Sequence, residues 1–94
     1  MKNSVDRIGL PALLEQTAEE CAELAHACLK EARRLRGENP TPCTEEECYS
    51  EIVDEEADVY NCMMCLMEAG YMWARGDVED KLDRWHQRLD EDGK

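Results

Sequence analysis

Long apolar stretches are missing from this chain of 94 residues, and basic side chains are scarce, with 11 Lys and Arg against 23 Asp and Glu. Without an apolar span of about 20 residues or a segment of signal-peptide type, we expect a cytoplasmic protein that has no membrane partner. The formal charge of -12 would repel nucleic-acid backbones and anionic lipids alike. Alternating strand patterns and internal repeats are also absent, which indicates an all-α fold.

This length supports a single domain over residues 1–94, and so short a helical domain has difficulty covering its own apolar surface. We therefore expect a homodimer or a tetramer. The sequence contains six cysteines, and a reducing compartment favours free thiols over disulfides. Five of the cysteines fall in helical patterns, where we expect them to be small core residues: Cys21, Cys28, Cys48, Cys62 and Cys65.

The clearest helical pattern covers residues 12–35. Pro11 suits the first turn of a helix, and Gly37 follows a basic last turn as a stop signal. Residues 37–43 contain two prolines and one glycine, so this segment is predicted to be a connecting loop.

A second long helix is predicted from the capping-box pattern Thr44-x-x-Glu47 to about residue 69, just before Gly70. A third helix is predicted from Asp77, as its N-cap, through Leu89 to a charged tail. Residues 71–76 fit either an extension of the second helix or a turn that covers a site.

The second helical pattern is apolar on two sides. One side is a row that includes Glu55, and the other is a second apolar band formed by Tyr49, Val53, Tyr60, Met63, Met64 and Met67. Two apolar sides predict burial by two neighbours. We therefore expect antiparallel helices that complete a four-helix bundle by dimerisation, with the helices of two chains arranged around a set of carboxylates.

These carboxylates belong to two short motifs, Glu20-x-x-Glu23 and Glu55-x-x-Asp58. Residues three apart on a helix share a face, so each motif presents two oxygen ligands at one place. Both motifs lie inside or beside apolar rows, whereas solvated acids lie opposite such rows. Two like charges about 4 Å apart repel by roughly 4 kcal/mol at an effective dielectric near 20, so four gathered acids need compensation. Either the two motifs lie apart in the fold, or their carboxylates share protons or Mg²⁺, and we expect Mg²⁺.

Residues 19–24 (EECAEL) and 54–59 (DEEADV) resemble the two acidic motifs of the all-alpha nucleoside triphosphate pyrophosphohydrolases of MazG type. The resemblance spans most of residues 10–90 and implies Mg²⁺-dependent hydrolysis of (d)NTP to (d)NMP and pyrophosphate. It implies that Glu20, Glu23, Glu55 and Asp58 hold the metal and are the catalytic carboxylates. The 31 residues between Glu23 and Glu55 exceed the spacing in compact members, and the excess falls in the loop at 37–43.

The same resemblance implies substrate-binding positions. Lys30 would contact a phosphate, and Asn61 would touch the nucleotide. Near the carboxyl end, Lys81, Arg84 and Arg88 resemble the basic positions that relatives place near phosphates, although a solvated basic face is an equal interpretation.

The implied reaction is attack of water at the alpha phosphorus, and it needs no nucleophilic side chain. A bound metal would neutralise charge on the phosphoryl oxygens and lower the pKa of a bound water. Glu19 and Glu56, next to the expected ligands, are candidates for the general base, and exposed helix residues are the simpler interpretation of both.

One alternative is a di-iron helical bundle, because Glu23-x-x-His26 and Asp83-x-x-His86 imitate its carboxylate–histidine pairs. Against this, the second pair uses aspartate and leaves Asp58 without a role.

A second alternative is a structural zinc site in a non-catalytic helical interaction module, formed by Cys62 and Cys65 together with Cys43 and Cys48. A third is a helical dimer that binds nucleotides or another chain without catalysis.

Overall fold

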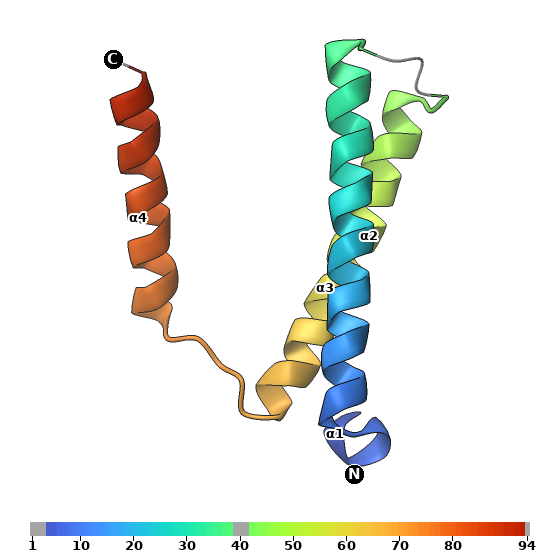
Figure 1. Cartoon of the computed structure of the whole chain (residues 1–94), viewed down its shortest axis with the longest axis vertical. Helices are drawn as coiled ribbons and strands as arrows, with labels where there is room; N and C mark the ends of the chain where they lie inside the picture. The colour runs from blue at the N-terminus through green and yellow to red at the C-terminus, as the bar shows by residue number, and fades with distance from the viewer. Residues whose placement is uncertain (1–3, 39–41, 94) are drawn as a thin grey trace.

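A computed structural model describes residues 4–38 and 42–93, which form helices joined by turns and short linkers (Figure 1). The helices are α1 (Ser4–Ile8), α2 (Leu10–Arg36), α3 (Glu45–Glu68) and α4 (Arg75–Asp92). No strand occurs within these two ranges, so the expected all-α class is confirmed. Residues 39–41 of the predicted loop lie outside the described residues.

Helix α2 is the predicted first helix with two residues added before it and one after it. It ends at Gly37, which has φ +65° and donates its backbone N–H to the carbonyl oxygens of Arg33 and Arg34 at 3.0 and 3.2 Å. A left-handed residue at this position is easiest for glycine, because glycine has no Cβ to clash with the last turn.

Helix α3 begins where the capping pattern predicted. The Thr44 hydroxyl accepts a hydrogen bond from the backbone N–H of Glu47 at 3.1 Å. Three glutamates in the first turn, residues 45–47, place negative charge beside the positive end of the helix dipole. The helix ends before Gly70, whose φ of +97° turns the chain away.

Helix α4 begins at Arg75 with Ala74 as its N-cap, so the predicted start was two residues late and the prediction of Asp77 as the N-cap was wrong by three residues. Arg75 pairs with Glu79 one turn later at 2.9 Å, and this contact supports a turn that begins before Asp77. Asp77 lies inside the first turn instead, where its charge still suits the helix dipole. Residues 71–74, which fitted either a helix or a turn, form a non-helical linker.

The core of the structure lies between α2 and α3, which run antiparallel as a hairpin (Figure 1). The fully buried apolar side chains of the described residues all belong to these two helices: Leu13, Ala27, Cys48 and Cys62. Helix α1 packs against one end of the hairpin, and there Ser4 Oγ donates a hydrogen bond to Cys65 Sγ at 3.1 Å. Such a thin core leaves much of the apolar surface uncovered.

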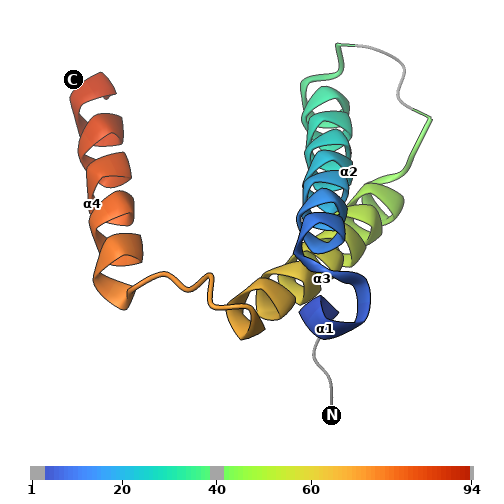
Figure 2. The same cartoon turned by 60° about the horizontal axis from the view of Figure 1, so that its bottom comes forward.

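Helix α4 packs against none of the other helices. It stands apart from the hairpin in both views, joined to it by the linker at 70–74 (Figure 2). Four residues of the second apolar band of α3, for which a neighbour was predicted, are accordingly exposed in the single chain: Tyr49, Val53, Tyr60 and Met64, while Met63 and Met67 are half-buried. No helix in the described ranges combines the length and apolarity needed to cross a bilayer.

The cysteines follow the prediction only in part. Cys48 and Cys62 are buried, but Cys21 and Cys28 are exposed, because they face the side of α2 that no helix covers. Cys43 and Cys48 form a disulfide across the first turn of α3, so the expectation of free thiols was wrong for this pair. The pairing is possible because the capped turn brings two residues five apart in sequence together.

Candidate metal site

Three of the four predicted carboxylates meet between α2 and α3. Glu20 and Glu23 from α2 and Glu55 from α3 each place one oxygen within 4.8 Å of the others. Within residues 4–38 and 42–93, no other group of three His, Cys, Asp or Glu side chains converges in this way. We call these three residues the carboxylate cluster.

Local helix geometry accounts for this arrangement. Glu20 and Glu23 lie on one side of α2 because they are three residues apart, and Glu55 lies in the row of α3 that faces α2. Gln16, one turn before Glu20, donates its side-chain N–H to Glu20 Oε1 at 2.7 Å and so orients that carboxylate. The antiparallel packing of α2 on α3 then brings the two motifs together.

Two oxygens of the cluster are buried without a partner. Glu20 Oε2 and Glu55 Oε2 are shielded from solvent, and neither accepts a hydrogen bond from the described residues. A buried carboxylate oxygen without a donor is costly, because it has lost water and gained nothing in return. Both oxygens are therefore suited to coordinating a cation.

The electrostatics of Glu55 also favour a bound cation. Burial raises the pKa of its carboxyl group above the ordinary value, and the charges of Glu23, Asp58 and Glu20 raise it further. The protonated group can also share a hydrogen bond with Glu23. An ionised Glu55 is thus repelled by its neighbours, and a cation between them would remove that repulsion.

Asp58 was predicted as the fourth ligand, but its oxygens are not part of the close group. Its side chain is exposed on the next turn of α3, where it still acts on the charge of Glu55. The reason is angular, because three residues of an α-helix turn by about 300° and leave Asp58 pointing further out than Glu55.

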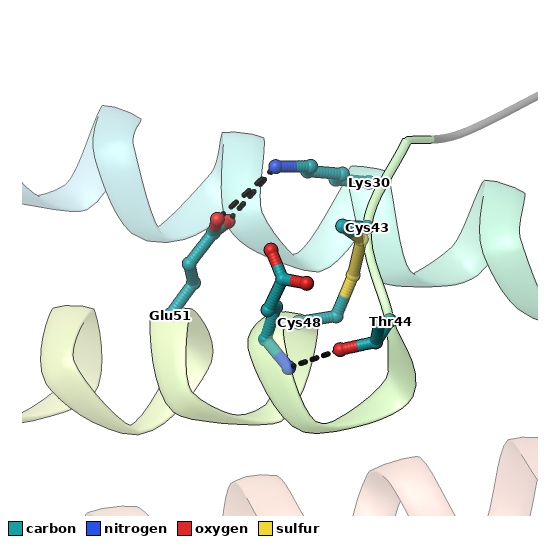
Figure 3. A network of polar contacts seen from close by, with 6 residues as sticks. Lys30, Cys43, Thr44, Cys48 and Glu51 are labelled. Carbon is teal, nitrogen blue, oxygen red and sulfur yellow. Dashed lines mark hydrogen bonds and ion pairs between the residues drawn. A yellow bond between two sulfur atoms is a disulfide. The ribbon is translucent and has the colours of Figure 1, made fainter.

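Lys30, the predicted phosphate contact, is engaged with α3. Its Nζ lies 3.1 and 3.3 Å from the two carboxylate oxygens of Glu51 (Figure 3). This ion pair joins the two helices about two turns from Glu23 and next to the disulfide-linked first turn of α3. The structure places the ammonium at the hairpin interface, where it pairs with Glu51 and not with a member of the carboxylate cluster.

The other predicted substrate positions lie outside the cluster. Asn61 is exposed on α3, and Lys81, Arg84 and Arg88 are exposed on α4, which does not contact the hairpin. The two general-base candidates, Glu19 and Glu56, are exposed as well. Within one chain, therefore, none of Lys81, Arg84 and Arg88 reaches the carboxylates.

The geometry does not assemble the di-iron site. His26 and His86 are both exposed, and they belong to α2 and α4, which are not in contact. No histidine of the described ranges joins a group of three potential metal ligands.

The zinc set is not assembled either, because Cys43 and Cys48 are joined to each other as a disulfide. Burial raises the pKa of the Cys62 thiol and outweighs the opposing hydrogen bond with Thr17. A buried thiol with a raised pKa is a poor source of the thiolate that zinc requires.

The sequence did not predict that Glu51 pairs with Lys30 near the site. Its signal was available, since Glu51 lies one turn before Glu55 on the same face of α3. An open depression of about 380 Å³ lies where α2 ends and α3 begins; it is lined by Glu31, Glu45, Glu46 and Tyr49 and includes none of the carboxylate cluster.

No protein-family model, no curated protein and no solved structure matches this chain. Function is therefore inferred from the side chains themselves.

Proposed function

We propose that this protein is a Mg²⁺-dependent nucleoside triphosphate pyrophosphohydrolase that converts (d)NTP to (d)NMP and pyrophosphate. The observation that carries the proposal is the convergence of Glu20, Glu23 and Glu55, with two buried oxygens that lack partners. Mg²⁺ takes oxygen ligands and is usually held by carboxylates together with substrate phosphates. Asp58 is the proposed fourth ligand, since it lies one turn from Glu55.

The chemistry follows from the charges. A triphosphate would be repelled by a chain with a formal charge of -12, so it needs a metal ion bound between it and the carboxylates. When bound, Mg²⁺ would neutralise charge on the phosphoryl oxygens and acidify a bound water. The water oxygen would bond to the alpha phosphorus as the bond to the bridging oxygen breaks and pyrophosphate leaves, and a carboxylate not engaged by the metal, for which Glu19 and Glu56 are the candidates, would take the proton.

The resemblance of residues 19–24 and 54–59 to the MazG-type motifs agrees with this chemistry, because the clustered residues are those the motifs would supply. Lys30 and Asn61 remain the proposed contacts to substrate on the hairpin. For Lys30, this role requires its ammonium to leave Glu51 when a phosphate binds.

The proposal also covers assembly and location. We infer that two chains pair, as a homodimer or as half of a tetramer, so that helices from both complete a four-helix arrangement. The exposed second apolar band of α3 supports this pairing, since isolated chains rarely leave such a band uncovered. A cytoplasmic protein that acts on nucleotide pools is the corresponding setting.

A pyrophosphate-release assay over natural and damaged nucleotides, with and without Mg²⁺, tests the activity. Glu55→Gln should lower turnover at least about 100-fold. Loss of a residue that only supports a metal ligand costs up to about 100-fold, and loss of a ligand itself should cost no less. Asp54→Asn is the matched control, because this neighbouring side chain is exposed, lies outside the carboxylate cluster and has no proposed role in the reaction. Equal turnover in wild type and Glu55→Gln would refute the assigned role of Glu55.

A further inference from the structure

Helix α4 carries an apolar stripe that touches no other helix. Its members recur at intervals of four, three and four residues and are each 47% to 51% exposed: Val78, Leu82, Trp85 and Leu89. Such spacing places them on one side of the helix, as in helices that pack against a partner. A long helix with four large apolar side chains in water lacks the packing that normally stabilises it.

The hairpin carries a second uncovered surface, which we call the apolar face. It consists of the second apolar band of α3 and the exposed Leu14 of α2. With about 100° per residue, Leu14 of the apolar face and Glu23 of the cluster lie about 180° apart on α2. On α3, Tyr60 and Asp58 turn to opposite sides of the row that faces α2. The apolar face and the carboxylate cluster therefore lie on opposite sides of the hairpin.

The surface area of the chain shows how much remains to be covered. The accessible surface is 7511 Å², whereas a compact protein of 10.8 kDa would expose only about 5,500 Å². The radius of gyration is 17.1 Å, against about 12 Å for a compact chain of this length. The excess of about 2,000 Å² per chain is of the size that each partner covers in an obligate dimer.

One edge of the stripe is basic. Residues 4–74 contain sixteen acidic and five basic side chains, and α4 itself contains seven acidic and four basic ones, but Lys81, Arg84 and Arg88 lie along one edge of its stripe. The Arg88 guanidinium lies 5.8 Å from the centre of the Trp85 ring, which places a cation at that edge. A helix with a basic edge suits docking on a surface with acidic surroundings.

We propose that α4 is an exchange arm, whose apolar stripe docks on the apolar face of the hairpin in a second copy of this chain. Reciprocal exchange gives a two-fold dimer, in which α1, α2 and α3 of one chain and α4 of the other form a four-helix unit. The exchange arm specifies which surfaces form the dimer inferred above. This pairing does not depend on nucleotide hydrolysis. Because the apolar face is opposite the carboxylate cluster, the partner covers the core and leaves the carboxylates open to substrate.

Light scattering during size-exclusion chromatography of the full chain tests the exchange. Wild type should have twice the chain mass of 10.8 kDa at micromolar concentration. Leu82→Asp on the stripe and Met64→Asp on the apolar face should each raise the dimer dissociation constant at least about 30-fold. Leu82 contacts no other helix, so its replacement leaves the hairpin intact.

Gln87→Asp is the matched control, because it adds the same charge on the side of α4 opposite the stripe and should keep the dimer mass. Glu55→Gln should also keep it, which separates a failure of the exchange from a failure of the proposed activity. A wild-type protein that stays monomeric overturns the proposal, because α4 is then either unbound or packed on the hairpin of its own chain. If Leu82→Asp still forms dimers, the hairpins pair directly with each other. If Met64→Asp still forms dimers, two α4 helices pair with each other. Either result overturns the proposed exchange.

Discussion

Glu23 of α2 and Glu55 of α3 place carboxylate oxygens within 4.8 Å of each other across the hairpin. Among residues 4–38 and 42–93, neither carboxylate has a basic partner, and Lys30 is paired with Glu51. Two carboxylates in such contact cannot both be ionised without cost unless a cation lies between them. This relationship connects the packing of the hairpin to its stability and to its proposed chemistry.

Replacing Glu55 by Gln should raise the thermal unfolding temperature of the metal-free protein at neutral pH. Folding raises the pKa of Glu55, so the folded state favours the protonated form and ionisation opposes folding. The advantage of the variant should be smallest below the ordinary carboxyl pKa of 4.5 and should grow as the pH rises through the raised pKa. Unfolding temperatures measured in a chelator from acid to neutral pH check this, with Glu56→Gln as control. An advantage that does not change with pH would contradict the assigned cause.

Mg²⁺ should stabilise the folded protein through the carboxylate cluster. At a concentration 100 times its dissociation constant, a ligand that binds only the folded state adds about 2.7 kcal/mol to the free energy of unfolding. Glu20→Gln and Glu23→Gln should remove most of this gain, whereas the exposed Glu19→Gln should retain it. Urea denaturation with MgCl₂ and with NaCl at matched ionic strength separates binding from general screening of an acidic chain. Equal gains in all the variants would show that Mg²⁺ acts elsewhere.

The ion pair between Lys30 and Glu51 should contribute modestly to the pairing of α2 and α3. Their side chains are 27% and 46% exposed, so solvent screens the attraction, and a coupling energy of about 0.2–1 kcal/mol is expected. A double-mutant cycle with Lys30→Met and Glu51→Gln measures this coupling in the free energy of unfolding. The coupling should fall as salt is added, and a value that is insensitive to salt would argue against an electrostatic origin.

Loss of the disulfide should destabilise the start of α3. Cys43→Ser opens a loop closed by residues five apart in sequence, and loop-closure entropy for so short a loop corresponds to about 2 kcal/mol. Cys28→Ser, which changes an exposed free cysteine, should have little effect. Thermal unfolding with and without a reductant provides the check, since reduction should lower the stability of wild type but not of Cys43→Ser. A reductant effect of equal size in both proteins would assign it to other thiols.

The helices of the hairpin could be predicted because their signals are local. Gly37 ends α2, and the Thr44 hydroxyl caps α3, through contacts between residues only a few positions apart. The start of α4 was placed two residues late, because Asp77 is equally suited to an N-cap and to a first turn. The signal that decided between them was the pair formed by Arg75 and Glu79.

The candidate site could be predicted in part. The positions of Glu20 and Glu55 beside apolar rows predicted that they turn inward, and both are half-buried. The sequence could not show that Asp58 stays outside the close group, because this depends on how far α3 is rotated against α2. Nor could it show that Lys30 meets Glu51, because that contact depends on the register of the two helices.

By itself, the sequence determined the helical class, the ends of the hairpin helices and the inward direction of Glu20 and Glu55, since periodicity and caps act within one or two turns. Only the tertiary structure decided which carboxylates meet, which cysteines are joined and that α4 leaves its own hairpin uncovered. These features depend on contacts between distant segments, whose rotation and register are set by the packing of whole helices. Local patterns describe each helix separately and do not contain that information.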